Sequence, residues 1–145
     1  MQDLPHHYKA SANADSDSVV VVSSEGLPSL ETAGPVEFGG PGDAWSPEEL
    51  LVAAVADCFV LSFRAIARAS KLEWDSVSCE ASGTLDKVER VTQFTRFDMS
   101  VLLTVPAGCD EAKASRLLQR AEKHCLISNS LKSESHLTAT VRTAV

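Results

Sequence analysis

The chain has 145 residues, 44% of them hydrophobic, and a formal net charge of −7. Its length fits one domain, and its composition can build a hydrophobic core. The acidic balance argues against nucleic acid as a partner, because phosphate binding needs clustered Lys and Arg, and the first arginine is Arg64.

The N-terminal part predicts a meander of short strands over about residues 6–33. HYKASANA and SVVVVSS have strand character and are separated by the turn-prone ADSDS, and LPSLETA supplies a third strand. The next segment, GPVEFGGPGDAWSP, is rich in Gly and Pro and is expected to form a loop. The N-terminus lacks a basic segment followed by an apolar run, so we expect no secretory signal and a cytoplasmic location.

A central helix is expected over about residues 47–70. Ser46 suits the N-cap, and Pro47 and the two glutamates after it suit the first turn. The helix is apolar around most of its circumference as far as Phe63, so we expect it to be buried for most of its length. Its longest apolar run, Leu50 to Ala56, is shorter than the about 20 residues that span a membrane, so no membrane association is expected.

The rest of the chain predicts two long antiparallel strands, a helix and a last strand. The long strands cover about residues 73–105 with a turn near Glu89, the second helix about 110–125 and the C-terminal strand about 136–144. The expected fold class is therefore α+β, a single domain of antiparallel sheets around one long buried helix.

The four cysteines are Cys58, Cys79, Cys109 and Cys125. In a cytoplasmic protein they are expected to be thiols rather than a disulfide framework. No CxxC or Cys-His pair of zinc spacing is present, so no metal is expected, and no flavin or nicotinamide signature indicates a cofactor.

Two of these thiols are candidates for redox chemistry. Cys58 lies in the apolar central helix, and Cys125 ends the second helix beside Lys123 and His124. The alternative is that both pack as small hydrophobic residues, and this reading is favoured for the other two cysteines. Glu48 is ten residues before Cys58, about 15 Å along a straight helix, so it can reach that thiol only through a helix break or from a second subunit. Otherwise Glu48 simply compensates the helix dipole.

The string SPEELLVAAVADCF, followed about seventy residues later by CLISNSL, resembles the OsmC/Ohr family, the osmotically inducible protein C and organic hydroperoxide resistance proteins. The resemblance extends from about Gly39 to the end of the chain. It implies an intertwined α+β homodimer with its active sites at the subunit interface. Such a dimer would let Glu48 of one subunit act near a thiol of the other.

The resemblance also implies an activity, the reduction of organic hydroperoxides by thiols. Cys58 would be the peroxidatic cysteine, Cys125 the resolving cysteine that forms a disulfide with it, and Glu48 the carboxylate that orients a catalytic arginine. An external dithiol would supply the reducing equivalents. The expected pocket for the apolar body of the peroxide is lined by Phe59, Phe63 and Leu126.

The chain departs from the family pattern at the arginine. The family's arginine comes from the N-terminal strands, where this chain offers Lys9, a point charge without the planar fork of a guanidinium. Arg96, on a long strand, is the other candidate cation. Asp57 also stands where a small residue is usual, and an inward carboxylate there would raise the thiol pKa.

Three functions therefore remain open. The favoured one is a thiol peroxidase acting on organic hydroperoxides. The alternative is a non-catalytic relative that binds a small hydrophobic ligand or senses oxidation, and the missing arginine supports it. The third is a structural dimer without thiol chemistry.

Overall fold

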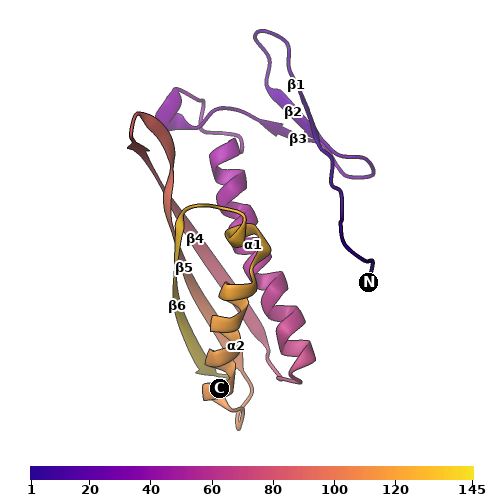
Figure 1. Cartoon of the computed structure of the whole chain (residues 1–145), viewed down its shortest axis with the longest axis vertical. Coiled ribbons are helices and arrows are strands. Elements are labelled where there is room, and N and C mark those ends of the chain that lie inside the picture. Colours follow the sequence, from indigo (N-terminus) through magenta and orange to yellow (C-terminus); the bar gives the residue numbers. More distant parts are fainter. The chain divides into compact units, whose positions relative to one another are not determined.

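The computed structural model describes residues 1–145, and the chain divides into two compact units, Met1–Leu50 and Leu51–Val145. Figure 1 shows the elements of both units along the chain. Each unit is described by itself. The expectation of one domain stays a prediction.

The first unit contains a small antiparallel sheet with the strand order β1-β2-β3. Its strands are β1 (Ser11–Asn13), β2 (Val20–Ser23) and β3 (Leu30–Thr32). A short 3₁₀ turn, η1 (Val36–Phe38), ends at Gly39, whose φ of 85° lies in the left-handed region that glycine adopts without steric cost. Trp45 then forms a parallel bridge with Thr32 and accepts a hydrogen bond from the Ala33 amide.

The long helix α1 (Pro47–Ala69) begins after Ser46, which acts as its N-cap. The Glu49 amide donates to the Ser46 hydroxyl oxygen at 3.2 Å, and that hydroxyl donates to Glu49 Oε1 at 3.0 Å. The helix buries a stripe with a spacing of four residues, which consists of Val55, Phe59, Phe63 and Ala67. By length and composition alone, α1 could also cross a membrane, a test that core helices of soluble proteins pass as well.

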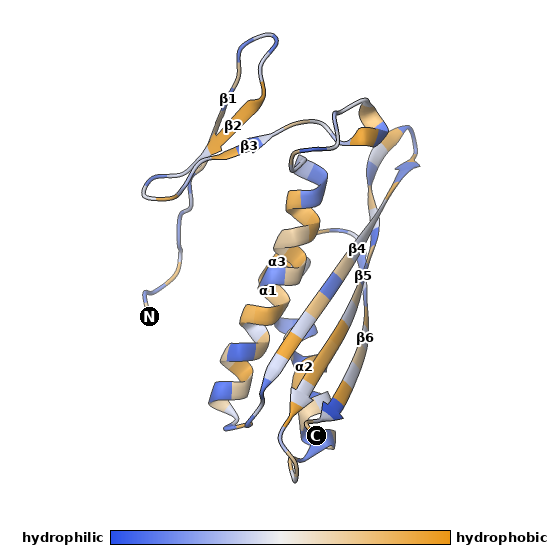
Figure 2. Ribbon diagram, turned by 180° about the vertical axis from the view of Figure 1, so that it is seen from behind, coloured by the Kyte–Doolittle hydropathy of each residue, from blue (hydrophilic) through white to orange (hydrophobic).

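The second unit contains a three-stranded sheet with the order β4-β5-β6. A hairpin joins β4 (Ser76–Val88) to β5 (Val91–Val105) through Glu89 and Arg90, and both of these residues have positive φ, as in a type I′ turn. Buried and exposed residues alternate along β5, so one face of the sheet meets the core. Figure 2 shows this alternation as hydrophobic and hydrophilic bands along the strands.

The expectation of purely antiparallel strands is wrong at one edge of this sheet. β6 (Glu134–Thr143) pairs with β5 in parallel, from Arg96↔Glu134 to Val105↔Thr143. The helical segment between β5 and β6 returns the chain to the other end of the sheet, so the last strand runs in the same direction as β5.

That returning segment contains α2 (Glu111–His124) and the short α3 (Leu126–Asn129). Asp110 caps α2 by accepting a hydrogen bond from the Lys113 amide. In Figure 1, α1 and α2 lie beside the same face of the sheet.

The core of the second unit lies between the two helices and that sheet face. Its buried members outside α1 are Leu72, Phe97, Met99, Val101, Leu103, Val105, Ala114, Leu117, Leu118 and Ala121. Phe63 also packs edge-to-face on Trp74, with ring centroids 5.5 Å apart. Each fully buried large apolar side chain stabilises the fold by about 1.5–3 kcal/mol. Burial of this layer therefore holds the two helices against the sheet.

Candidate active site

Cys58 lies in the middle of α1, next to the buried Phe59, and is itself half-buried. Its sulfur lies 3.9 Å from the hydroxyl of Ser62, one helical turn further along. Asp57 is exposed, so its carboxylate points to solvent and does not place a negative charge inside the core. A helix interior holds the Cys58 backbone rigidly, which fixes where the thiol can react.

Cys125 is the residue between two helices and is fully buried. It is at once the C-cap of α2 and the N-cap of α3, with an extended backbone of φ −68° and ψ 103°. The hydroxyl of Ser128 donates a hydrogen bond to its sulfur at 3.4 Å. Ser128 is three residues later in the CLISNSL string, so the one turn of α3 brings the hydroxyl back to the thiol.

Asn129, the residue after Ser128, holds the segment around Cys125 through two hydrogen bonds. Its amide N–H donates to the Cys125 carbonyl at 2.9 Å, and its side-chain Nδ2 donates to the Lys123 carbonyl at 3.0 Å. Both acceptors lie at the C-terminal end of α2, where backbone carbonyls lack partners within the helix. The string therefore fixes the position of Cys125 through its own local hydrogen bonds.

The structure brings the two predicted redox thiols together. Burial raises the pKa of Cys125, the hydrogen bonds from Ser128 oppose this, and hydrogen bonding and charge on Cys58 raise the pKa further. Both cysteines are free thiols. Residues 67 positions apart in sequence thus form one interacting pair.

A third thiol, for which the sequence favoured a packing role alone, belongs to this neighbourhood. Cys79 occupies an inward position of β4 opposite the buried Val101 and packs against the core. Burial, and then the charge of Cys125, raise its pKa to about 11. The alternation of β4 already assigns Cys79 to the inner face, but only packing shows which thiol it meets.

Glu48 and Lys9 both belong to the first unit. Glu48 is half-buried, and its Oε2 atom is buried without any hydrogen-bond partner. Lys9 is exposed and forms no ion pair. A buried carboxylate oxygen without a donor is costly, and the role of Glu48 in orienting a cation stays a prediction.

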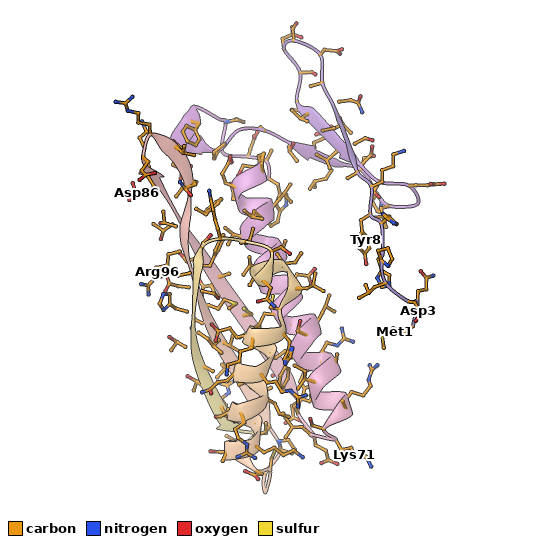
Figure 3. The ribbon with its side chains drawn as sticks, in the orientation of Figure 1. Met1, Asp3, Tyr8, Lys71, Asp86 and Arg96 are labelled. Atoms are coloured by element: carbon orange, nitrogen blue, oxygen red, sulfur yellow. The ribbon has the colours of Figure 1, made fainter.

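Arg96 lies on the outer face of the β4-β5-β6 sheet. Its Nη2 atom is 2.7 Å from Asp98 Oδ1, and the hydrogen bonds from Arg96 lower the pKa of Asp98. Because Phe97, the residue between them, points into the core, Arg96 points the other way. Figure 3 shows its side chain directed away from α1 and α2, so within one copy it does not approach Cys58.

The three side chains expected to line a peroxide pocket are placed differently from one another. Phe59 and Phe63 are fully buried members of the core, whereas Leu126 is 66% exposed. A fully buried ring cannot line an open pocket, so within one copy these residues do not form one. No group of three or more His, Cys, Asp or Glu side chains is placed to hold a metal ion.

A family model described as OsmC-like protein matches residues 40–140 of the chain. The chain is 29% identical over 144 residues to the uncharacterized protein YmaD of Bacillus subtilis (strain 168), which covers 94% of this chain and 95% of that protein. It is also 29% identical over 122 residues to an organic hydroperoxide resistance protein of Xanthomonas axonopodis pv. citri (strain 306), with 83% of each chain covered.

The fold is similar to that of solved structures. An OsmC-like protein of unknown function from Vibrio cholerae superposes with a TM-score of 0.83 at 18% identity, and the match covers 94% of this chain and 100% of that one. At this level of identity the similarity shows a shared fold.

Proposed function

The chain belongs to the OsmC-like family, and on that premise we propose that it is a thiol peroxidase that reduces organic hydroperoxides. The observation that carries this proposal is the interaction between the free thiols of Cys58 and Cys125. The name of the Xanthomonas relative supports the substrate class. The reaction uses free thiols, so the proposal places the chain in the reducing cytoplasm.

In the first proposed step, the Cys58 thiolate attacks one oxygen of the hydroperoxide. The S–O bond forms as the O–O bond breaks, Cys58 becomes a sulfenic acid, and the alkoxide leaves and is protonated to the alcohol. The sulfur is oxidised by two electrons, and the peroxide is reduced by two electrons.

In the second step, Cys125 attacks the sulfenic sulfur, the S–S bond forms, and hydroxide leaves as water with the proton of Cys125. The electrostatics support this order. While Cys58 is a thiolate, its charge raises the pKa of Cys125 and keeps that thiol protonated. The neutral sulfenic acid removes this charge, so Cys125 ionises more readily once its partner is oxidised. An external dithiol then reduces the disulfide.

The proposal includes a homodimer. Within one copy, 28% of the most apolar 18 residues of α1 are buried, and the side chain of Leu61 is 51% exposed. Exposed apolar surface on such a helix favours a protein contact. A second copy would cover it, and could supply a cation such as Lys9 to the unpartnered oxygen of Glu48.

One observation favours a second candidate, a non-catalytic relative that binds a small hydrophobic ligand or senses oxidation. No arginine precedes Arg64, and Arg96 is paired with Asp98 on the far face of the sheet. Without a cation the departing oxygen would lack electrostatic stabilisation.

The two candidates are separated by steady-state turnover. We expect the wild-type protein to consume cumene hydroperoxide continuously with dithiothreitol as the reductant, and Cys58→Ser to consume it at the rate of the buffer. Cys109→Ser is the matched control, because Cys109 donates to the Glu73 carbonyl and stands outside the thiol pair. Stoichiometric oxidation without turnover in the wild type would favour the sensing function.

A further inference from the structure

Three thiols lie on the inner side of the β4-β5-β6 sheet, and the proposed reaction uses only two of them. Cys125 interacts with Cys58 from α1, and it also interacts electrostatically with Cys79 from β4. The fourth cysteine, Cys109, precedes the N-cap of α2, at the opposite end of that helix from Cys125. The cluster therefore consists of Cys58, Cys79 and Cys125.

The sheet register places Cys79 near the end of α2 that holds Cys125. Cys79 pairs with Val101, Val101 pairs with Ala139, and Ala139 lines one cleft with Glu122 and Lys123 of α2. Gly83 of β4 is a point of close approach, because a Cβ atom there would lie 2.9 Å from Val52 Cγ2 of α1. A short link, residues 70–75, joins the two elements, so they run in opposite directions. Cys58 is about 9 Å beyond Val52 along the helix, and Cys79 is about 13 Å before Gly83 along the strand. Taken along parallel axes, Cys58 and Cys79 thus lie within about 4 Å of the same level, which is less than one helical turn.

We propose that Cys79 is a second disulfide partner of Cys125 and takes over the disulfide that Cys125 first forms with Cys58. The step is thiol–disulfide exchange: the Cys79 thiolate attacks the Cys125 sulfur, the new S–S bond forms, and Cys58 leaves as a thiolate. No electron is gained or lost overall, and the proton released by Cys79 balances the one taken up by Cys58. Cys58 is then free to reduce a second hydroperoxide before the external dithiol arrives, a consequence that rests on the proposed function.

The environment of Cys79 controls the rate of this exchange. Its pKa is raised to about 11, so at neutral pH a small fraction of it is the attacking thiolate. The exchange is therefore slow at neutral pH. Its rate rises about tenfold with each unit increase in pH, as long as the pH stays below that pKa. This order keeps Cys125 available to Cys58 first.

The first arm of the test asks whether Cys79 and Cys125 can form a bond without any peroxide. Reduced Cys58→Ser and Cys58→Ala proteins are oxidised with diamide, blocked with N-ethylmaleimide and mapped by peptide mass spectrometry. A Cys79–Cys125 disulfide is expected in both, with Cys109 fully alkylated, and it is expected to be absent when Cys79→Ser is added. Reduced thiols at both positions in folded protein, or Cys79 linked elsewhere, would overturn the proposal.

The second arm follows the exchange in the wild type at pH 7, 8 and 9. One equivalent of diamide and, separately, one equivalent of cumene hydroperoxide start the reaction, and acid-quenched samples are mapped over time. The Cys58–Cys125 disulfide is expected first, followed by Cys79–Cys125 at a rate that rises about tenfold per pH unit; in Cys79→Ser the first disulfide persists.

The two oxidants separate this inference from the proposed function. Exchange after diamide without any reaction with hydroperoxide would refute the peroxidase and leave the role of Cys79 intact. A Cys58–Cys125 disulfide that forms with hydroperoxide and never passes to Cys79 at pH 9 would refute the exchange and leave the peroxidase intact.

Discussion

The thiol of Cys58, in the middle of α1, interacts with the thiol of Cys125, the single residue that joins α2 to α3, and neither is in a disulfide. A rigid helix holds the first thiol, and a network of local hydrogen bonds holds the second. The chemistry expected of the site follows from the protonation states of these two sulfurs.

Cys125→Ser removes the resolving thiol and leaves Cys58 in place. We expect the variant to consume one equivalent of hydroperoxide and then to lose activity, because the Cys58 sulfenic acid has lost its resolving thiol and is oxidised further to the sulfinic acid. Intact-mass analysis after increasing hydroperoxide checks this. Sustained wild-type turnover in this variant would show that resolution does not require Cys125.

Ser128→Ala removes the hydroxyl that donates to the Cys125 sulfur. Because this hydrogen bond lowers the Cys125 pKa, its loss should raise that pKa and slow alkylation of Cys125 at a given pH by about tenfold. Ser130→Ala is the matched control, since that hydroxyl donates to the Leu126 carbonyl. Equal rates in the two variants would contradict a role for Ser128.

Glu48→Gln tests whether the buried carboxylate orients a cation. We expect turnover to fall by about a hundredfold without loss of thermal stability, because the charge that positions the cation is gone. Glu49→Gln is the control, since an amide oxygen can still accept from Ser46. Lys9→Met should reproduce the loss if Lys9 is the cation, and Arg96→Gln should reproduce it if that residue acts across a subunit interface.

Cys79 makes stability depend on pH in a predictable direction. Its pKa is raised from 9.0 to about 11 in the folded chain, so between these values the folded state keeps a proton that the unfolded state releases. Stability from this group is complete below pH 9 and is lost as the pH rises to about 11. The free energy of unfolding in urea should decline more steeply over this pH interval in the wild type than in Cys79→Ala. Equal declines in the two proteins would contradict the buried placement of Cys79.

The sequence predicts those parts of the fold that rest on local signals. The helix expected over about 47–70 spans Pro47–Ala69, because Ser46 and Pro47 mark its start chemically. The α+β class follows from alternation in the long strands and from the apolar stripe of the helix. The direction of β6 does not follow in this way, because it depends on where the crossover returns the chain.

The candidate site also combines features that local sequence signals predict with features that depend on long-range packing. The CLISNSL string identifies Cys125, but its pairing with Cys58 and the approach of Cys79 arise from packing between distant segments. The placement of Arg96 could have been inferred more closely, since strand alternation sets it opposite the buried Phe97. The burial of Phe59 and Phe63 could not be inferred in this way, because a helix that is apolar around most of its circumference does not show which face meets the sheet.

The most direct test of the central claim is a single-turnover map of the thiols. The fully reduced wild type, with its four free cysteines, is mixed with one equivalent of cumene hydroperoxide at pH 7 and quenched within seconds, alongside Cys58→Ser. The account predicts the loss of two thiols as a Cys58–Cys125 disulfide in the wild type and no loss in the variant. Four intact thiols in the wild type, or the same oxidation in the variant, would contradict it.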